Sequence, residues 1–403
     1  MRSFYFILYI PIGYWLISNV NTMNFPFTQE HSMLRDMARD FTDAEIRPIA
    51  SRIDYEEKIP EQLLKKIAEV GLFGTAIPEE YGGGGFGKVG FCIAQEEVAR
   101  VCGSTAATIG AHQSIGAQAI LVGGSETLKK KYLPRLATGE FLAAFALTEA
   151  DAGSDSFNLS TRAEKKGDKW LLTGEKVWIT NGALADVFSV FARTEKGITG
   201  FVVEKSFGGI TVGKNEKKLG IKGSVTNTLA FDNVEIPEEN MIGADGRGFL
   251  VAMETLNSGR LGLGAACFGA AKEMLEMSVA YSKQRKQFGE PISKFQAIQF
   301  MLSDMATHIY AMENMVYKAA FKLDNKEDIT LDAAIVKLYC SEAVSQIADQ
   351  ALQIHGGMGF SAELPLERFY RDARILKIFE GTNEIQKLII SRQILKQNGK
   401  WKS

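Results

Sequence analysis

Apolar residues recur at intervals of three and four over most of the first 140 residues, which is the spacing of amphipathic helices. Thr28 is a predicted N-cap, and Pro60 is predicted to open a second helix. Further helical patterns cover residues 89–122 and 125–138. The apolar positions of the first two helices are Leu34, Met37, Ala38 and Phe41, then Leu63, Leu64, Ile67 and Val70.

Near residue 143 the apolar period changes from helical to two, which predicts strands. The predicted strands cover residues 169–180, 187–193, 198–204 and 226–231. Long helical patterns return at 249–284, 293–324, 330–354 and 383–397. We therefore expect an N-terminal helical domain over residues 23–142, a central β domain over 143–247 and a C-terminal helical domain over 248–403.

Residues 1–22 stand outside this pattern. The apolar run from Phe4 to Ile17 is broken by Pro11 and Gly13 and is too short to span a bilayer comfortably. It is similar to the apolar part of a signal peptide but has no small-residue cleavage site after it. We expect a leader or an over-extended start, with the globular part beginning near Met23.

Composition narrows the class of protein. The 403-residue chain is 46% hydrophobic and 23% charged, as in ordinary globular proteins. Its net charge of −2 argues against a nucleic acid or an anionic membrane as partner. The histidines lack the spacing of metal ligands, so no metal is predicted. Four scattered cysteines, expected as free buried thiols, are Cys92, Cys102, Cys267 and Cys340.

Glu380 is the leading candidate for acid–base chemistry. It follows the apolar residues Ile378 and Phe379 and precedes Gly381, so its side chain is expected to be desolvated. Burial disfavours a carboxylate and raises its pKa, which suits a general base that works near neutrality. The alternative is a loop carboxylate paired with Arg371 or Arg374.

A second group of candidates lies in the β region. Residues 145–155 are predicted to form a strand that runs into a turn of small residues, where backbone groups and hydroxyls can contact a ligand. Trp178 and Thr180 end a later strand and offer a stacking plane and a hydroxyl to a heteroaromatic ring. Simple strand packing is the alternative for both stretches.

One further motif indicates no site. Gly82, Gly84 and Gly87 match the GxGxxG pattern of dinucleotide-binding loops. No apolar strand leads into them, and no strand ending in an acidic residue follows at the required distance. We therefore expect a loop between helices here.

Taken together, these stretches resemble the acyl-CoA dehydrogenase family of flavin enzymes over about residues 25–398. The resemblance implies an α+β fold with an N-terminal helical domain, a central antiparallel β domain and a C-terminal four-helix bundle. It rests on several motifs in family order, namely Ala-Leu-Thr-Glu-Ala-Asp-Ala-Gly-Ser-Asp (residues 146–155), Trp178-Ile-Thr180, Arg285-Lys-Gln-Phe-Gly289, Gln353-Ile-His-Gly-Gly-Met-Gly359 and Phe379-Glu-Gly-Thr382.

The resemblance implies FAD as cofactor and assigns it ligands by position. Some of these ligands, Arg285, Phe288, Gln353, Gly356 and Gly357, would hold the ADP half of FAD, largely from a neighbouring subunit. The others are Phe145, Leu147, Thr148, Gly153, Ser154, Trp178, Ile179, Thr180, Thr382 and Glu384. The implied contacts to the acyl-CoA substrate are Ser154, Asn257, Arg260, Gly381, Ala107 and Ala111.

The reaction implied is α,β-dehydrogenation of an acyl-CoA. Glu380 would take the α-proton, the Cβ hydride would pass to flavin N5, and the backbone N–H of Glu380 with a flavin ribityl hydroxyl would stabilise the thioester oxygen. An electron-transferring flavoprotein would receive the electrons, and the assembly would be a homotetramer. The resemblance implies a cytoplasmic enzyme in a bacterium or one of the mitochondrial matrix in a eukaryote.

Finer features of the resemblance concern the base, the flavin loop and the substrate. Some family members carry the base at the position of Gly259, which has no side chain here, so Glu380 is the candidate base. Ala150-Asp151 and Asn158 depart from the usual flavin loop.

A catalytically silent scaffold homologue and an acyl-CoA oxidase are the rival functions. The retained Glu380 and flavin ligands disfavour the scaffold, and the chain length disfavours the oxidase.

The expected substrate is a long acyl chain. Residues 110–116 and 197–211 resemble the very-long-chain branch of the family, without its extra C-terminal region. Ala107 and Ala111, with Gly110 between them, replace longer side chains of medium-chain relatives and predict a deep acyl pocket. The alternative is that these small residues only allow close helix packing.

Overall fold

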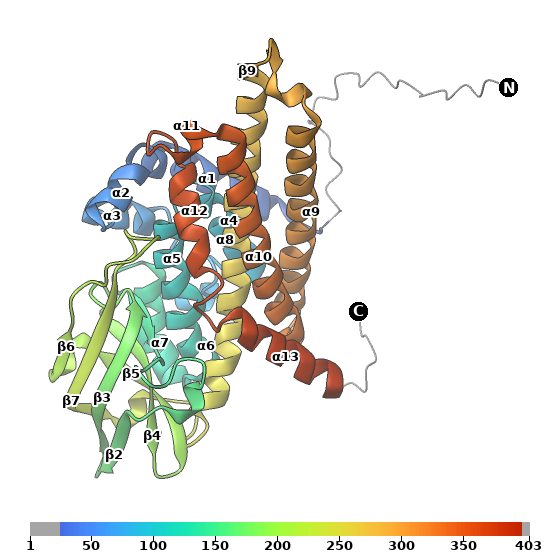
Figure 1. The fold of residues 1–403 in the computed structure, drawn as a ribbon. Helices are drawn as coiled ribbons and strands as arrows, with labels where there is room; N and C mark the ends of the chain where they lie inside the picture. The colour runs from blue at the N-terminus through green and yellow to red at the C-terminus, as the bar shows by residue number, and fades with distance from the viewer. Residues whose placement is uncertain (1–24, 397–403) are drawn as a thin grey trace.

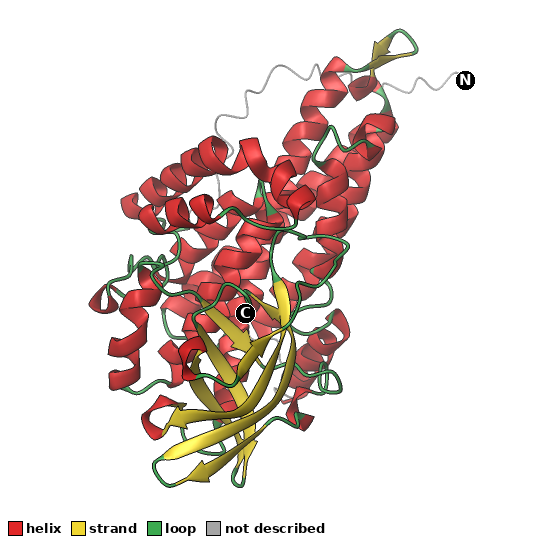
Figure 2. Ribbon diagram, turned by 90° about the vertical axis from the view of Figure 1, so that its left-hand side faces the viewer, coloured by secondary structure: helices red, strands yellow, loops and turns green. Residues whose placement is uncertain are grey.

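The structure, a computed structural model, describes residues 25–396. Helices form both ends of this range and strands form its middle, so the predicted α–β–α order is confirmed (Figures 1 and 2). The expected leader at residues 1–22 and the start at Met23 lie outside the described residues. Within residues 25–396, no helix is both long enough and apolar enough to cross a bilayer.

The N-terminal part is built from seven α-helices, with π-helical stretches at Thr42–Ile46 and Ala111–Ala117. The predicted cap at Thr28 is present, since its side chain accepts from the backbone N–H of His31. The continuous helix predicted at 89–122 is instead broken after Ala99 and again at Ala111, where a π-helical stretch begins. The elements are α1 (Gln29–Phe41), α2 (Ala50–Glu56), α3 (Glu61–Glu69), α4 (Gly87–Ala99), α5 (Gly103–Gly110), η4 (Ala111–Ala117), α6 (Gln118–Gly123) and α7 (Glu126–Ala137).

The glycine-rich stretch before α4 is a loop, as predicted. A Cβ added at Gly83 would lie 2.1 Å from the backbone oxygen of Ile77, so the chain's own backbone occupies the space beside this glycine. The close approach that glycine allows here serves chain packing rather than a nucleotide.

The middle part is one eight-stranded sheet in the order β6-β7-β3-β2-β4-β5-β8, with β1 paired to β4. Most pairs are antiparallel, as expected for the central domain, and β1–β4 and β2–β4 are parallel. β2 was not predicted because only one of its five residues is buried. The strands are β1 (Ala143–Ala146), β2 (Arg162–Lys166), β3 (Lys169–Thr180), β4 (Val187–Thr194), β5 (Gly197–Glu204), β6 (Ile210–Val212), β7 (Thr226–Pro237) and β8 (Met241–Ile242).

Three long helices, α8, α9 and α10, run side by side through the C-terminal part (Figure 1). α12 was not predicted, and α13 crosses the lower end of the long helices. A small hairpin of β9 and β10 lies at the far end of α8 from the sheet. The elements are α8 (Gly248–Gln284), β9 (Lys286–Gln287), β10 (Glu290–Pro291), α9 (Gln296–Asp324), α10 (Thr330–His355), α11 (Gly357–Phe360), α12 (Leu366–Ile375) and α13 (Asn383–Lys396).

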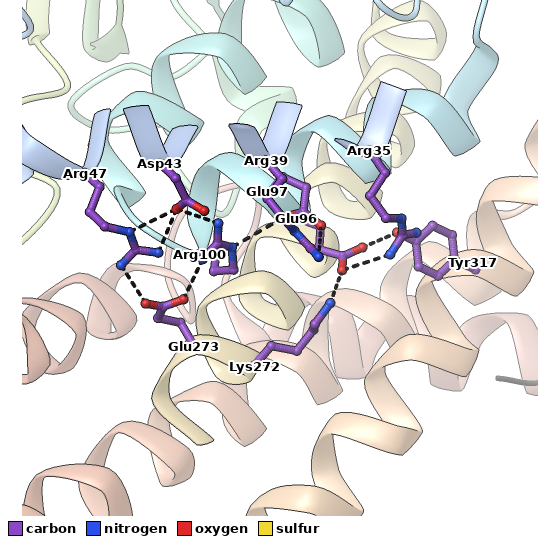
Figure 3. Close-up of polar contacts among 10 residues, drawn as sticks. All are labelled: Arg35, Arg39, Asp43, Arg47, Glu96, Glu97, Arg100, Lys272, Glu273 and Tyr317. Carbon is purple, nitrogen blue, oxygen red and sulfur yellow. Dashed lines mark hydrogen bonds and ion pairs between the residues drawn. The ribbon is translucent and has the colours of Figure 1, made fainter. Parts of the chain in front are cut away.

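Buried ion pairs join the N-terminal helices to the long C-terminal helices (Figure 3). Glu96 of α4 is fully buried and pairs with Arg35 of α1 at 3.3 Å and Lys272 of α8 at 2.5 Å. It also accepts a hydrogen bond from Tyr317 of α9. Burial would raise the pKa of Glu96, but Lys272 and Arg35 outweigh burial and hold it below its usual value. The pairs therefore keep this carboxylate charged inside the packing of α1, α4, α8 and α9.

Candidate active site

Glu380 lies in the short loop between α12 and α13. Its backbone φ is +56° and that of Gly381 is +90°, so the loop turns through left-handed conformations at both residues. Glycine adopts such angles freely, but a glutamate does so at a cost of about 1–3 kcal/mol. The residue keeps partial exposure, yet its Oε2 is buried and has no hydrogen-bond partner among the described residues.

The wall opposite Glu380 is formed by Gly259 of α8 and Ile115 of the π-helical stretch. A Cβ added at Gly259 would lie 2.1 Å from Oε2 of Glu380 and 2.8 Å from Cγ2 of Ile115. The absence of a side chain at Gly259 therefore makes the space that the carboxylate occupies.

The backbone of the Glu380 loop is held from two helices. Arg260 of α8 donates its Nε to the carbonyl of Glu380 at 3.3 Å. Gln386 of α13 donates its Nε2 to the carbonyls of Glu380 and Gly381 at 3.3 and 2.9 Å. Asn257, predicted as a substrate contact, accepts from Nη1 of Arg260 at 3.0 Å and so orients that arginine.

Burial raises the pKa of Glu380 to about 7, against the opposing charges of Arg260 and Lys337. The predicted direction of this shift is confirmed. A carboxyl group with such a pKa is a competent general base near neutral pH.

The alternative ion-pair reading of Glu380 is wrong. Arg371 instead pairs with Asp54 and Glu367, both at 2.7 Å. Arg374 is exposed, and no ion pair of Glu380 occurs among residues 25–396.

The predicted flavin stretches at residues 145–148 and 178–180 come together in the sheet. The N–H of Val177 donates to the carbonyl of Thr148 at 2.9 Å, and the buried Lys176 donates to the carbonyl of Leu147 at 3.0 Å. Lys176 also pairs with Glu149 at 2.7 Å. These contacts fix the turn after β1 against the end of β3.

Trp178 and Thr180 differ in exposure although both end β3. Trp178 has φ +60° at a register shift between β3 and β7, and its side chain is 61% exposed. Thr180 is half-buried, and Ile179 between them is buried. An exposed indole held in a left-handed backbone is costly without a ligand, so simple strand packing does not explain Trp178.

Several predicted cofactor residues face open space. Ser154 is exposed, and a Cβ added at Gly153, Gly356 or Gly357 would meet no atom within 4 Å. Gly356 also has φ +59°. These glycines are therefore not required by packing within the described chain, which fits a cradle that a bound FAD would fill.

The π-helical stretch connects the sheet to the Glu380 loop. Gly116 packs on Ala143 of β1, where an added Cβ would lie 2.7 Å from the alanine Cβ, and its carbonyl accepts from Ser189 of β4 at 2.9 Å. The preceding residue, Ile115, shares a core cluster with Phe145 and Leu147. The π-helical stretch therefore lies between the residues predicted to line the flavin and the Glu380 loop.

The remaining predicted FAD ligands fall into two groups, one beside Glu380 and one at the far ends of α8 and α10. Thr382 and Glu384 lie beside Glu380 at the start of α13. Arg285 and Phe288 follow the far end of α8, roughly 40 Å along the helix from Gly259 at 1.5 Å per residue. Gln353, Gly356 and Gly357 lie at the far end of α10 (Figure 1). One chain therefore does not gather all these residues around a single flavin.

Ala107 and Ala111, which were predicted to line the acyl pocket, lie on the helical segment that leads to Ile115. Gln95 of α4 reaches the same helix. In the amide orientation that satisfies both of its atoms, Gln95 donates to the carbonyl of Ala106 at 3.1 Å and accepts from the N–H of Gly110 at 3.2 Å. The space beside Gly110 is thus filled by a buried amide from a different helix.

Sequence reasoning missed Lys337 and Gln95. Lys337 is fully buried and lies close enough to Glu380 to influence its pKa. A charge within the apolar run Ala333–Cys340 was the available signal for Lys337. Gln95 carried no comparable signal, because its role depends on the packing of α4 against α5.

Three domain families match successive parts of the chain. Residues 28–140 match the acyl-CoA dehydrogenase N-terminal domain, residues 144–234 its middle domain and residues 246–395 its C-terminal domain. The relatives include bacterial proteins and mammalian mitochondrial ones.

Individual relatives are similar along nearly their whole length. The short-chain specific acyl-CoA dehydrogenase of Clostridium acetobutylicum is 42% identical, covering 93% of this chain and 100% of that protein. The butyryl-CoA dehydrogenase structure from Megasphaera elsdenii has a TM-score of 0.90 and 40% identity, with coverage of 93% and 100%. One chain of a structure reported as the electron transferring flavoprotein of Acidaminococcus fermentans has a TM-score of 0.91 and 40% identity, also with coverage of 93% and 100%.

These comparisons do not support the predicted likeness to the very-long-chain branch. The relatives named here with a chain-length designation are short-chain or butyryl enzymes. That likeness rested on residues 110–116 and 197–211. The small residues at 107, 110 and 111 led to the separate prediction of a deep acyl pocket, and they do not reveal that Gln95 occupies the adjoining space.

Proposed function

The chain belongs to the acyl-CoA dehydrogenase family of FAD-dependent oxidoreductases, and we propose that it dehydrogenates short acyl-CoA thioesters with Glu380 as the catalytic base. The observation that carries this proposal is the Oε2 of Glu380, which is buried and has no hydrogen-bond partner among the described residues. The raised pKa of Glu380, about 7, keeps a large fraction of the carboxyl deprotonated at neutral pH while leaving it basic enough to take an α-proton.

The same loop offers a donor for the thioester oxygen. Among residues 25–396, the backbone N–H of Glu380 forms no hydrogen bond outside regular secondary structure. A free N–H beside the base can stabilise the negative charge that develops on the oxygen as the α-proton leaves. Arg260 and Gln386 keep this N–H in place by holding the carbonyls of the turn.

We assign the isoalloxazine end of FAD to the exposed plane of Trp178 with Thr180 and the turn at residues 145–154. When bound there, FAD supplies the acceptor for the hydride that leaves the substrate's Cβ. Thr382 and Glu384 approach the cofactor from the Glu380 loop.

The distant residues Arg285, Phe288, Gln353, Gly356 and Gly357 are proposed to hold the ADP half of a FAD bound mainly to a neighbouring subunit. Their separation from Glu380 along α8 and α10 supports this, as does the 94% exposure of Phe288. The proposed assembly is a homotetramer, in which two subunits complete each flavin site.

We propose short acyl chains because a side chain from another helix occupies the space behind the helical segment beside Glu380. Ile115, Ala111 and Ala107 lie along the helical segment that leads away from Glu380. Gln95 of α4 fills the space beside Gly110, which belongs to the same segment. A buried amide that is already hydrogen-bonded is costly to displace, so long chains gain little there. Ser154 and Gly381 are proposed to contact the CoA moiety and the thioester.

The proposed electron acceptor is an electron-transferring flavoprotein. A chain of this fold occurs in the structure reported for the Acidaminococcus fermentans flavoprotein, which supports such a pairing. We propose the bacterial cytoplasm as the compartment if the source is bacterial, and the mitochondrial matrix if it is eukaryotic.

Anaerobic titration of the FAD-loaded protein with butyryl-, hexanoyl-, octanoyl- and palmitoyl-CoA tests the proposal. The flavin absorbance is expected to fall with butyryl- or hexanoyl-CoA at the lowest concentrations. A protein that is bleached only by palmitoyl-CoA would refute the short-chain assignment, and one bleached by none would refute the dehydrogenase itself.

A further inference from the structure

A buried lysine that the proposed reaction does not use lies behind the Glu380 loop. Lys337 of α10 is 0% exposed, and its Nζ donates to Oδ1 of Asn383 at 2.7 Å. No carboxylate of residues 25–396 forms an ion pair with it. A buried cation without a carboxylate partner is costly, so its retention calls for a physical explanation.

Asn383 joins this lysine to the loop that carries Glu380. It is the first residue of α13, and its backbone N–H donates to the carbonyl of Lys377 at 3.1 Å, which closes the loop on itself. Its side-chain Nδ2 donates to Glu342 of α10 at 2.8 Å, and its Oδ1 also accepts from Ser341 at 3.2 Å. Side chains of α10 therefore hold the base of the loop in place through the amide of Asn383.

The loop depends on these contacts because its backbone is strained. The φ of +56° at Glu380 persists only where surrounding contacts over-determine it. Arg260 and Gln386 bond the loop carbonyls from one side, and the contacts of Asn383 with α10 hold it from the other.

The charges around the carboxylate also depend on Lys337. The cations that act on Glu380 are Arg260 from α8 and Lys337 from α10, and both oppose the effect of burial. Burial and, more weakly, the charge of Arg260 lower the pKa of Lys337 to about 8. Glu380, Cys267 of α8 and Glu384 of α13 oppose this shift. Lys337 is therefore largely protonated at neutral pH and supplies one of two positive charges that favour the ionised base.

We propose that Lys337 is a positioning residue for the base Glu380, fixing the loop of residues 377–383 through Asn383 and favouring the carboxylate with its buried positive charge. This inference rests on the proposed function, since it takes Glu380 to be the base. It adds a residue that acts through Asn383 and through its charge rather than by touching substrate.

Two substitutions separate the charge of Lys337 from its hydrogen bond. Lys337→Gln keeps a donor for Asn383 but removes the charge, and Lys337→Arg keeps the charge. Lys318→Met, on the exposed face of α9, is the control for loss of any lysine. The measurement is the pH dependence of kcat/KM for butyryl-CoA with the FAD-loaded enzyme, with flavin content and Tm recorded for each variant.

In Lys337→Gln the limb on which activity rises with pH is expected to move up by about one pH unit, since a nearby opposite charge lowers a carboxyl pKa by 1–3 units. Activity on the acidic side should fall about tenfold while the high-pH plateau changes less. Lys337→Arg and Lys318→Met should leave the limb in place. Asn383→Ala, which keeps the lysine, should lower the plateau without moving the limb.

A limb that stays in place in Lys337→Gln would overturn the proposal, and so would a variant that fails to fold or to hold flavin, because Lys337 would then serve the fold alone. Glu380→Gln in the same assay distinguishes the two levels. If Glu380→Gln keeps normal turnover, the proposed base is wrong. If it is inactive while the Lys337 variants keep the wild-type limb, only the inference on Lys337 fails.

Discussion

The carboxylate of Glu380 occupies the space that a side chain at residue 259 would fill. A Cβ at Gly259 would lie only 2.1 Å from Oε2 of Glu380. A side chain at residue 259 and the carboxylate of Glu380 therefore exclude each other, and the glycine on α8 is a requirement of the glutamate in the loop.

Gly259→Ala is expected to displace Glu380 and to destabilise the protein by about 1–3 kcal/mol, the usual cost of overpacking. Turnover should fall sharply because the carboxylate can no longer keep its position. Thermal unfolding and kcat/KM measure the two effects. In a Glu380→Gly background the same alanine should cost far less stability, and an unchanged cost there would mean that the clash lies elsewhere.

The burial of Glu380 makes folding stability depend on pH. Its pKa is about 7 in the folded protein against a usual value of 4.5, so the protonated form is favoured by folding. The penalty for ionising it is absent below about pH 4.5 and complete above about pH 7, where it reaches about 3 kcal/mol.

Glu380→Gln removes this penalty, so the variant should gain stability relative to wild type as the pH rises from about 5 to about 8. Denaturant unfolding at the two pH values measures the gain, and Glu327→Gln, at an exposed carboxyl between α9 and α10, is the matched control. A stability difference that is the same at both values would argue that the carboxyl is solvated.

Gln95 is predicted to limit the length of the acyl chain. Gln95→Ala should open space beside Gly110 and raise the kcat/KM for octanoyl-CoA relative to butyryl-CoA by about tenfold or more, since each buried methylene contributes about 0.8 kcal/mol. Gln62→Ala, exposed on α3, should leave the ratio unchanged. If Gln95→Ala also leaves it unchanged, the acyl chain does not approach α4.

Arg285→Ala is expected to weaken FAD retention and the tetramer together. If this exposed arginine bridges a diphosphate between subunits, its loss removes a charge from a shared site. Size-exclusion chromatography with flavin absorbance measures both. Lys283→Ala, an exposed neighbour at the end of α8, should behave as wild type. A flavinated tetramer of Arg285→Ala would place this arginine outside the cofactor site.

The parts of the fold that the sequence predicted are those with a strong local signal. β3 was predicted over residues 169–180 as found, because its polar and apolar positions alternate between turn residues. β2 was missed because its residues are nearly all exposed, and α12 was missed because two charged residues, Arg368 and Asp372, lie among its buried positions. The break of the long helix at Ala111 was missed because a π-helical turn depends on packing against β1 and α8.

The candidate site shows the same division. Glu380 could be found from the apolar run before it and the glycine after it, and the pKa rise follows from that burial. The comparisons do not support the long-chain prediction, and small residues at 107, 110 and 111 say nothing about the side chain that packs on them from α4. Lys337 was missed because its effect depends on the fold bringing α10 behind a loop more than 40 residues later.

The reduction of FAD by butyryl-CoA in Glu380→Gln tests the central claim most directly. Wild type and variant, both FAD-loaded and anaerobic, are mixed with butyryl-CoA while the visible flavin absorbance is followed. We predict that the variant binds the ligand and keeps its flavin, but that its absorbance decays about 10²–10⁴-fold more slowly, because the amide preserves shape without basicity. Decay at the wild-type rate would contradict the account, since the α-proton would then leave without Glu380.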